Sequence, residues 1–315
     1  MKFINKKIII IFLFLLFNLF LTIPNLLNAG SIFKFNNQFA LLDFSHNYLN
    51  LQSKKFQIND KSFFSQILPS GNWGPWLIRY RVYLPLDYNP NLQYGVVYFL
   101  HGRTGNRFIL DSIGIQNTLN EYYKRGGNKF ILTSLDGGDN YWMNAARKNE
   151  RWGDVVTQEF ITEIENNYSV IRTSFGRVLA GISMGGHGAI QNALNHPGTY
   201  GAIAAHSPVF RTQEEATRDF PDQFGTGNDF QDRDPFSLIL NKGKKISTPL
   251  WIDIGGSDFA FTNTNNFANL IKSQNINNLE LHIGEDKIGG HNTGYWQYHL
   301  LEYLNWYGKH LPSPH

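Results

Sequence analysis

The chain has 315 residues, of which 28 are basic and 25 acidic, and it contains no cysteine. This length is sufficient for one domain with a full hydrophobic core, and the lack of cysteine excludes disulfides, thiol catalysis and thiolate metal sites. Three of the basic residues are Lys2, Lys6 and Lys7, so the rest of the chain carries 25 basic and 25 acidic residues. A neutral domain of this kind argues against nucleic-acid binding.

The first residues have the pattern of an export signal. The three lysines precede an apolar run from Ile8 to about Ile23, and small residues follow at Ala29 and Gly30. This pattern predicts a signal peptide over residues 1–29, which would make the mature protein periplasmic or secreted. The apolar run is nearly long enough to span a bilayer, so a retained membrane anchor is the alternative. We expect no other contact with a membrane.

Residues 30–75 show no clean period, and we expect an irregular N-terminal segment, with one strand at most, packed on a catalytic domain at 76–315. Short apolar runs then predict strands, the first of them near a sheet edge, and helical spacing recurs between them. Strands alternating with helices predict an α/β fold with a mainly parallel sheet covered on both faces. The runs are 77–84, 96–100, 130–132, 178–180, 202–204, 250–252 and 279–281. The patternless stretch 211–245 is expected to be a loop or small helical insertion over the site.

Ser183 lies in a Gly-x-Ser-x-Gly run between Gly181 and Gly185, directly after one predicted strand and before a helix. This context is that of a nucleophile elbow, in which the two glycines permit the sharp turn that exposes a strained serine. Ser183 is therefore the candidate nucleophile. His187 beside it is expected to serve packing or to lie at the surface.

In the α/β-hydrolase fold the nucleophile is followed in the chain by an acid and then by a histidine. His291 lies in a glycine-rich loop between the last predicted strand and the C-terminal helix, which makes it the candidate base. Asp258 follows a strand and a Gly-Gly-Ser turn, from which it could reach the imidazole, whereas Asp253 lies inside that strand. We predict Asp258 as the acid, with Asp253 as the alternative and Asp286 as a more remote one.

Two backbone N–H groups are needed to stabilise an oxyanion. Met184, after the nucleophile, and Arg103, in the loop after the strand 96–100, are the predicted donors, with Gly102 as an alternative to Arg103. His101 in that loop is expected to be structural.

Aromatic residues make up 15% of the chain, which is compatible with an aromatic-lined cleft. Trp142 and Trp296 are the predicted substrate-binding residues and Phe259 is a further candidate, although each would ordinarily belong to a core. The most acidic stretch, 228–234, lacks the central glycine and terminal glutamate of a calcium loop. With no metal-ligand spacing elsewhere, we predict neither metal nor cofactor.

Several of these motifs together resemble one known family. The chain contains Val82–Pro85, the His101-Gly102 pair, the run 181–186, Gly255–Asp258 and Gly290-His291, in that order. They resemble the putative esterase family of α/β-hydrolases, which includes esterase D (S-formylglutathione hydrolase), tributyrin, feruloyl and acetylxylan esterases and mycolyltransferases. The resemblance covers about residues 80–304. It implies the fold, a serine triad and ester chemistry, and it leaves the substrate open. The runs 136–138 and 151–154 also look like family features near an acyl or alcohol pocket.

We therefore predict an exported serine carboxylesterase with a Ser-Asp-His triad, acting on a small-molecule or carbohydrate ester through an acyl-enzyme on Ser183. Acyl transfer to a sugar acceptor is one alternative. A catalytically inactive hydrolase fold used as a binding module is another. The sequence does not indicate an oligomeric state.

Overall fold

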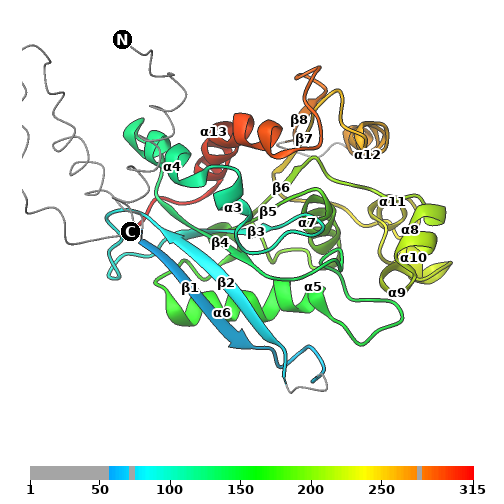
Figure 1. The fold of residues 1–315 in the computed structure, drawn as a ribbon, viewed down its shortest axis with the longest axis horizontal. Coiled ribbons are helices and arrows are strands. Elements are labelled where there is room, and N and C mark those ends of the chain that lie inside the picture. Colours follow the sequence, from blue (N-terminus) through cyan, green and yellow to red (C-terminus); the bar gives the residue numbers. More distant parts are fainter. Residues whose placement is uncertain (1–56, 71–74, 275–278) are drawn as a thin grey trace, which may run out of the picture. The chain divides into compact units, whose positions relative to one another are not determined.

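The structure is a computed structural model that describes residues 57–70, 75–274 and 279–315. Within these residues eight strands form one sheet in the order β1-β2-β4-β3-β5-β6-β7-β8 (Figure 1). The strands are β1 (Gln57–Phe64), β2 (Leu77–Leu84), β3 (Gly95–Leu100), β4 (Phe130–Leu135), β5 (Arg177–Ile182), β6 (Ala202–His206), β7 (Leu250–Ile254) and β8 (Leu279–Ile283).

Strands β3 to β8 run parallel, whereas β1 and β2 add antiparallel at the β4 side. The expected mainly parallel α/β sheet is therefore confirmed. The carboxyl ends of the parallel strands all meet at one edge of the sheet, which is where α/β proteins of this kind build their sites.

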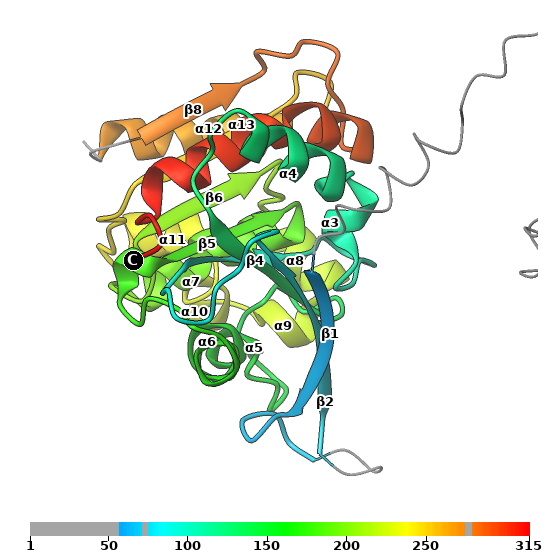
Figure 2. The same ribbon diagram turned by 90° about the vertical axis from the view of Figure 1, so that its left-hand side faces the viewer.

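Side chains of the central strands alternate between two cores. In β3, Tyr98 and Leu100 lie in one core, whereas Val97 and Phe99 lie in the other. Burial on both faces explains why this strand reads as a continuous apolar run. Helices α6, α7 and α12 pack on the first face, and α3, α4 and α13 pack on the second (Figures 1 and 2). Their bounds are α3 (Ile109–Ser112), α4 (Ile115–Lys124), α6 (Phe160–Asn167), α7 (Met184–Asn195), α12 (Phe261–Ser273) and α13 (Thr293–His310).

The stretch 211–245 is a small helical insertion between β6 and β7, one of the two forms expected for it. It contains α8 (Gln213–Asp219), α9 (Pro221–Phe224), α10 (Asn228–Gln231) and α11 (Pro235–Leu240). Thr212 begins α8 with a capping box completed by Glu215, and Asp234 caps α11 through the Ser237 N–H. These caps explain how a stretch without clear periodicity still forms helices. Before α6, the chain also forms α5 (Trp152–Asp154) and a π-helical turn at Val155–Glu159.

The segment before residue 76 contains the one strand allowed for it, but this strand belongs to the sheet of the expected catalytic domain. Residues Gln57–Phe64, assigned above to an irregular segment outside the catalytic domain, form β1 at the edge of the same sheet and pair with all of β2. The sheet therefore begins before residue 76. Most β1 side chains are partly or fully exposed, so the strand lacks the apolar alternation by which a strand is recognised. The predicted signal peptide and residues 30–56 lie outside the described residues.

The described helices include none with both the length and the apolar character that a membrane crossing requires.

Candidate active site

Ser183 occupies a sharp turn between β5 and α7. Its backbone has φ 57° and ψ −118°, a conformation that is strained for a residue with a side chain. A side chain at Gly185 would collide with the backbone of Leu100, and one at Gly181 would collide with Gly185. The Ser183 N–H donates to the His206 carbonyl at 2.9 Å, and the Ser183 carbonyl accepts from the Val209 N–H at 3.2 Å. The end of β6 thus holds the strained turn in place.

His291 connects this serine to an acid. The Ser183 hydroxyl donates to His291 Nε2 at 2.8 Å, and His291 Nδ1 donates to Asp258 Oδ2, also at 2.8 Å. The Asp258 carboxylate is fully buried, whereas the imidazole retains 15% exposure. Three residues that are far apart in the sequence therefore form one chain of hydrogen bonds, in which the imidazole is partly exposed and the carboxylate is buried.

The loops that carry Asp258 and His291 are joined through their backbones. The Ser257 N–H donates to the Gly289 carbonyl at 3.0 Å, and the Gly256 N–H donates to the Asp286 carbonyl at 2.7 Å. Asp258 also accepts a hydrogen bond from the Ala260 N–H through its other oxygen, Oδ1. These contacts fix the spacing between Asp258 and His291.

Asp253, the alternative acid, does not reach His291. Its carboxylate is buried and accepts hydrogen bonds from the side chains of His206, Trp251, Tyr295 and Tyr303 at 2.6–3.1 Å. Burial alone would raise the pKa of Asp253, but His206 and the hydrogen bonds from Tyr303 and Trp251 outweigh burial and lower the pKa below its usual value. Asp253 is thus the centre of a buried polar cluster beneath the site.

Asp286, the remote alternative, accepts hydrogen bonds from the backbone N–H groups of Ile288 and Gly289. It is a turn residue of the loop before His291, and no hydrogen bond joins it to the imidazole.

The loop after β3, residues 101–108, lies against Ser183. A Cβ built at Gly102 would be 3.1 Å from Ser183 Cβ, so the backbone comes as close as glycine permits. His101 Nδ1 donates to the Gly102 carbonyl at 2.7 Å, and its Nε2 accepts the Gly137 N–H at 3.2 Å. Burial lowers the pKa of His101, in keeping with a neutral ring that holds the loop. Arg103 follows Gly102 in this loop, and Met184 follows Ser183 as the first residue of α7.

The three aromatic candidates have different positions. Trp142 is fully buried and donates from its ring N–H to the His101 carbonyl at 3.0 Å, so it supports the loop and does not line a cleft; that prediction was wrong. Trp296 is 8% exposed and packs edge-on against His291 with ring centroids 5.2 Å apart. Phe259 is 71% exposed, and its ring lies 4.6 Å from that of His291. Of the three, Phe259 is the one open to a bound molecule.

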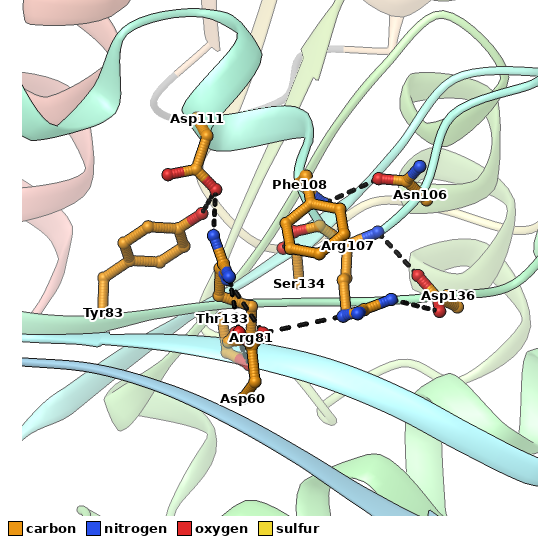
Figure 3. Close-up of polar contacts among 10 residues, drawn as sticks. All are labelled: Asp60, Arg81, Tyr83, Asn106, Arg107, Phe108, Asp111, Thr133, Ser134 and Asp136. Carbon is orange, nitrogen blue, oxygen red and sulfur yellow. Dashed lines mark hydrogen bonds and ion pairs between the residues drawn. The ribbon is translucent and has the colours of Figure 1, made fainter. Parts of the chain in front are cut away.

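Sequence reasoning missed a polar cluster that holds the loop 101–108 (Figure 3). The Arg107 N–H and guanidinium both donate to Asp136 at the end of β4, at 2.8 and 2.9 Å. The guanidinium also lies 3.6 Å from Asp60 of β1, and Asp60 in turn pairs with Arg81 of β2. The Phe108 ring lies near both guanidinium groups, 4.1 and 4.3 Å from their centres. Residues from four segments thus anchor the loop, and nothing in the sequence pattern indicates that they meet.

The helical insertion packs against the start of α7. Tyr141 makes edge-on contacts with His187 and with Phe220 and Phe224 of the insertion, and its hydroxyl accepts a hydrogen bond from Arg211 at 2.8 Å. His187 is completely buried, and burial lowers its pKa to about 3. It is the packing residue that its place in the sequence led us to expect, and not a surface one.

The amino-acid sequence is similar to a known protein family and to known proteins. The family model described as "Putative esterase" matches residues 75–307. The chain belongs to the putative esterase family. Membership makes it a hydrolase of carboxylic ester bonds, and an esterase also appears among its curated relatives. An acetyl esterase of Caldicellulosiruptor saccharolyticus is 23% identical over 229 residues, which cover 68% of this chain and 83% of that protein.

Solved structures of other esterases share the fold of this putative esterase. A ferulic acid esterase has a TM-score of 0.66 at 18% identity, covering 82% of this chain and 100% of that one. An S-formylglutathione hydrolase from Agrobacterium tumefaciens also has a TM-score of 0.66, at 16% identity, covering 82% and 97%. At these identities the likeness concerns the fold. It confirms the expected α/β-hydrolase architecture.

Proposed function

We propose that this chain is an exported serine carboxylesterase in which Ser183, His291 and Asp258 form the catalytic triad. The observation that carries the proposal is the geometry of His291, whose two ring nitrogens lie 2.8 Å from the Ser183 hydroxyl and 2.8 Å from the Asp258 carboxylate. This arrangement meets the distance required for a general base acting on a nucleophile. The signal-like pattern at residues 1–29 is the basis for export.

In the acylation step, His291 Nε2 takes the hydroxyl proton while Ser183 Oγ forms a bond to the ester carbonyl carbon. Asp258 stabilises the imidazolium that results and keeps the ring in the tautomer that presents Nε2 to the serine. Collapse of the tetrahedral intermediate breaks the carbon–oxygen bond of the ester, and His291 returns the proton to the departing alcohol. The acyl group remains on Ser183.

Deacylation repeats this sequence with water. His291 removes a proton from a water molecule as its oxygen attacks the acyl-enzyme carbonyl, and the proton then passes to Ser183 Oγ as the acid is released. The 15% exposure of His291 is compatible with access of water from the solvent side.

The negative charge of both tetrahedral intermediates requires fixed donors. We propose the backbone N–H groups of Met184 and Arg103 in this role. The Met184 N–H is in the first turn of α7, where backbone N–H groups lack intrahelical acceptors. The Arg103 N–H follows Gly102, which lies against Ser183. Neither group requires a metal or a cofactor.

The test of this function is hydrolysis of p-nitrophenyl esters from acetyl to long-chain acyl by the purified full-length chain. We expect activity, highest on the acetyl ester, because a relative over 68% of the chain is an acetyl esterase. A fluorophosphonate should label Ser183 and block this activity, and in the producing cells the activity should be found outside the cytoplasmic fraction. A folded chain with neither turnover nor labelling would contradict the proposed function, and cytoplasmic activity would contradict export.

The anchoring of the loop 101–108 gives a second prediction. In Arg107→Met the contacts of the guanidinium to Asp136 and Asp60 are lost, whereas the backbone N–H of residue 107 can still donate to Asp136. The loop that carries the Arg103 N–H is then held less firmly. We expect kcat for p-nitrophenyl acetate to fall by about 10- to 100-fold with little change in KM, because misplacement of a catalytic group by about 1 Å has effects of that size.

A suitable control for this variant is Arg125→Met. Arg125 is an exposed arginine that pairs with Glu121, and its replacement should leave kcat unchanged. Equal kcat values for the two variants and the parent would mean that Arg107 does not position the loop.

A further inference from the structure

A cavity lies beside the loop 101–108, on the side away from β7 and β8. It has a volume of about 310 Å³ and lies between the start of β2 and the loop that follows β4. Asp139 lines it and accepts the Thr104 N–H at 2.6 Å. The Asp136 N–H, also in its wall, donates to the Arg79 carbonyl at 2.8 Å. The cavity is therefore at the carboxyl edge of the sheet, as is Ser183, with the loop between them.

One wall of this cavity is aromatic and open. Trp76 is 40% exposed, and Leu77 next to it is 43% exposed. The Trp76 ring packs edge-on against Trp152 at 5.9 Å, and Trp152 packs in the same way against the buried Trp142 at 6.0 Å. An exposed indole is thus held in place by a row of buried rings. A rigid aromatic surface of this kind suits a flat ligand face with C–H groups.

The other walls are polar. Arg79, Glu150 and Gln223 line the cavity, and their side chains make no hydrogen bond within the described residues. Together with Asp139 they provide a guanidinium, two carboxylates and an amide around an apolar surface. A ligand that satisfies them must carry several donors and acceptors around its rim and an apolar face. Hydroxylated sugar rings have this distribution, because their hydroxyl groups project outward and their axial C–H groups form a face.

We propose that this cavity is a saccharide subsite, in which a sugar ring stacks on Trp76 and bonds to Arg79, Asp139, Glu150 and Gln223. The role of the subsite rests on the proposed esterase function: it would hold one unit of an oligosaccharide while an acylated unit lies at Ser183. Such a ligand would pass over Gly102 and Arg103, the residues that separate Ser183 from Asp139. The subsite makes carbohydrate esters the substrate class of this enzyme.

The experiment separates binding from catalysis. The full-length chain with Ser183→Ala is titrated calorimetrically with unesterified xylotetraose, cellotetraose and chitotetraose, so that no turnover is involved. We expect saturable binding of at least one of these probes, and about tenfold weaker binding after the further change Trp76→Ala, since the loss of one aromatic contact is worth up to about 1.4 kcal/mol. Glu150→Gln should also weaken binding. Phe175→Ala removes an aromatic side chain that is 76% exposed at the amino end of β5, and it should leave binding unchanged.

Urea unfolding provides the check on folding. The Trp76→Ala and Glu150→Gln variants should each unfold in one cooperative transition, so that weaker binding is not caused by loss of the fold. The proposal is overturned if none of the three probes binds, or if binding survives both Trp76→Ala and Glu150→Gln. Saturable, Trp76-dependent binding by a chain that hydrolyses no ester would support the subsite and refute the esterase function, so the two failures are distinguishable.

Discussion

Replacing Ser183 by alanine is expected to abolish hydrolysis of p-nitrophenyl acetate, with kcat falling by about 10⁶-fold. The Ser183 hydroxyl, which donates to His291 Nε2 at 2.8 Å, is the nucleophile of the proposed mechanism. Alanine leaves only the oxyanion donors and substrate binding to assist direct attack by water. The measurement is the steady-state rate of purified parent and variant.

The control for this prediction is Ser273→Ala, at the end of α12. Its hydroxyl is exposed and donates to the carbonyl of Leu270 in its own helix, so its loss should leave kcat at the parent value. If Ser183→Ala retains more than about 1% of the parent rate, another residue is the nucleophile.

The second large effect concerns the aspartates Asp253 and Asp258. Removal of the first carboxylate should mainly lower stability, and removal of the second should mainly lower activity. Asp253→Ala removes the acceptor of four buried donors and is expected to lower the free energy of unfolding by about 3–5 kcal/mol, because charged and polar partners remain buried without a bond. Asp258→Ala is expected to lower kcat by about 10⁴-fold, because the imidazole loses the group that fixes its tautomer, and to affect stability less.

Urea unfolding and p-nitrophenyl acetate kinetics on both variants check this pair. Because the folded state lowers the pKa of Asp253, its stabilising contribution is complete above the ordinary aspartate range and is lost as the pH falls below about 4. The stability difference between parent and Asp253→Ala should therefore shrink in acid. Loss of activity in a stable Asp253→Ala, with an active Asp258→Ala, would reverse the assignment of the acid.

The fold could be predicted from local patterns where both faces of a strand are buried. The run Val96–Leu100 is apolar at every position because its side chains enter two cores in turn. A short, continuous apolar run between glycine-containing turns is typical of a strand that is buried on both faces. β1 is different. It contains Asn59, Asp60 and Lys61, and its stability comes from pairing with β2 and not from an apolar face of its own.

The three residues of the proposed triad could be predicted from the sequence, because the required chemistry and the order of the residues in the chain leave few candidates. A serine in a strand-turn-helix context, a later acid after a strand and a last histidine in a loop leave few choices, and the structure brings Ser183, Asp258 and His291 together. The sequence could not show whether Trp142 lines a cleft or belongs to a core, because a tryptophan near glycines has the same local pattern in both positions. The contacts of Arg107 with Asp136 and Asp60 join segments up to 76 residues apart, and one sequence carries no record of such pairings.

The junction between the loops that carry Asp258 and His291 has a consequence for the evolution of substrate specificity in this enzyme. The junction consists of backbone hydrogen bonds and of the close approach of Gly255 to Gly289, so it depends on very few side chains. Phe259 and Ile288, in the same loops, are 71% and 89% exposed. A substitution at the more exposed Ile288 would change this rim while the backbone junction between the two loops stays in place. The rim of the proposed site could therefore vary in evolution without a change in the backbone that holds Asp258 and His291.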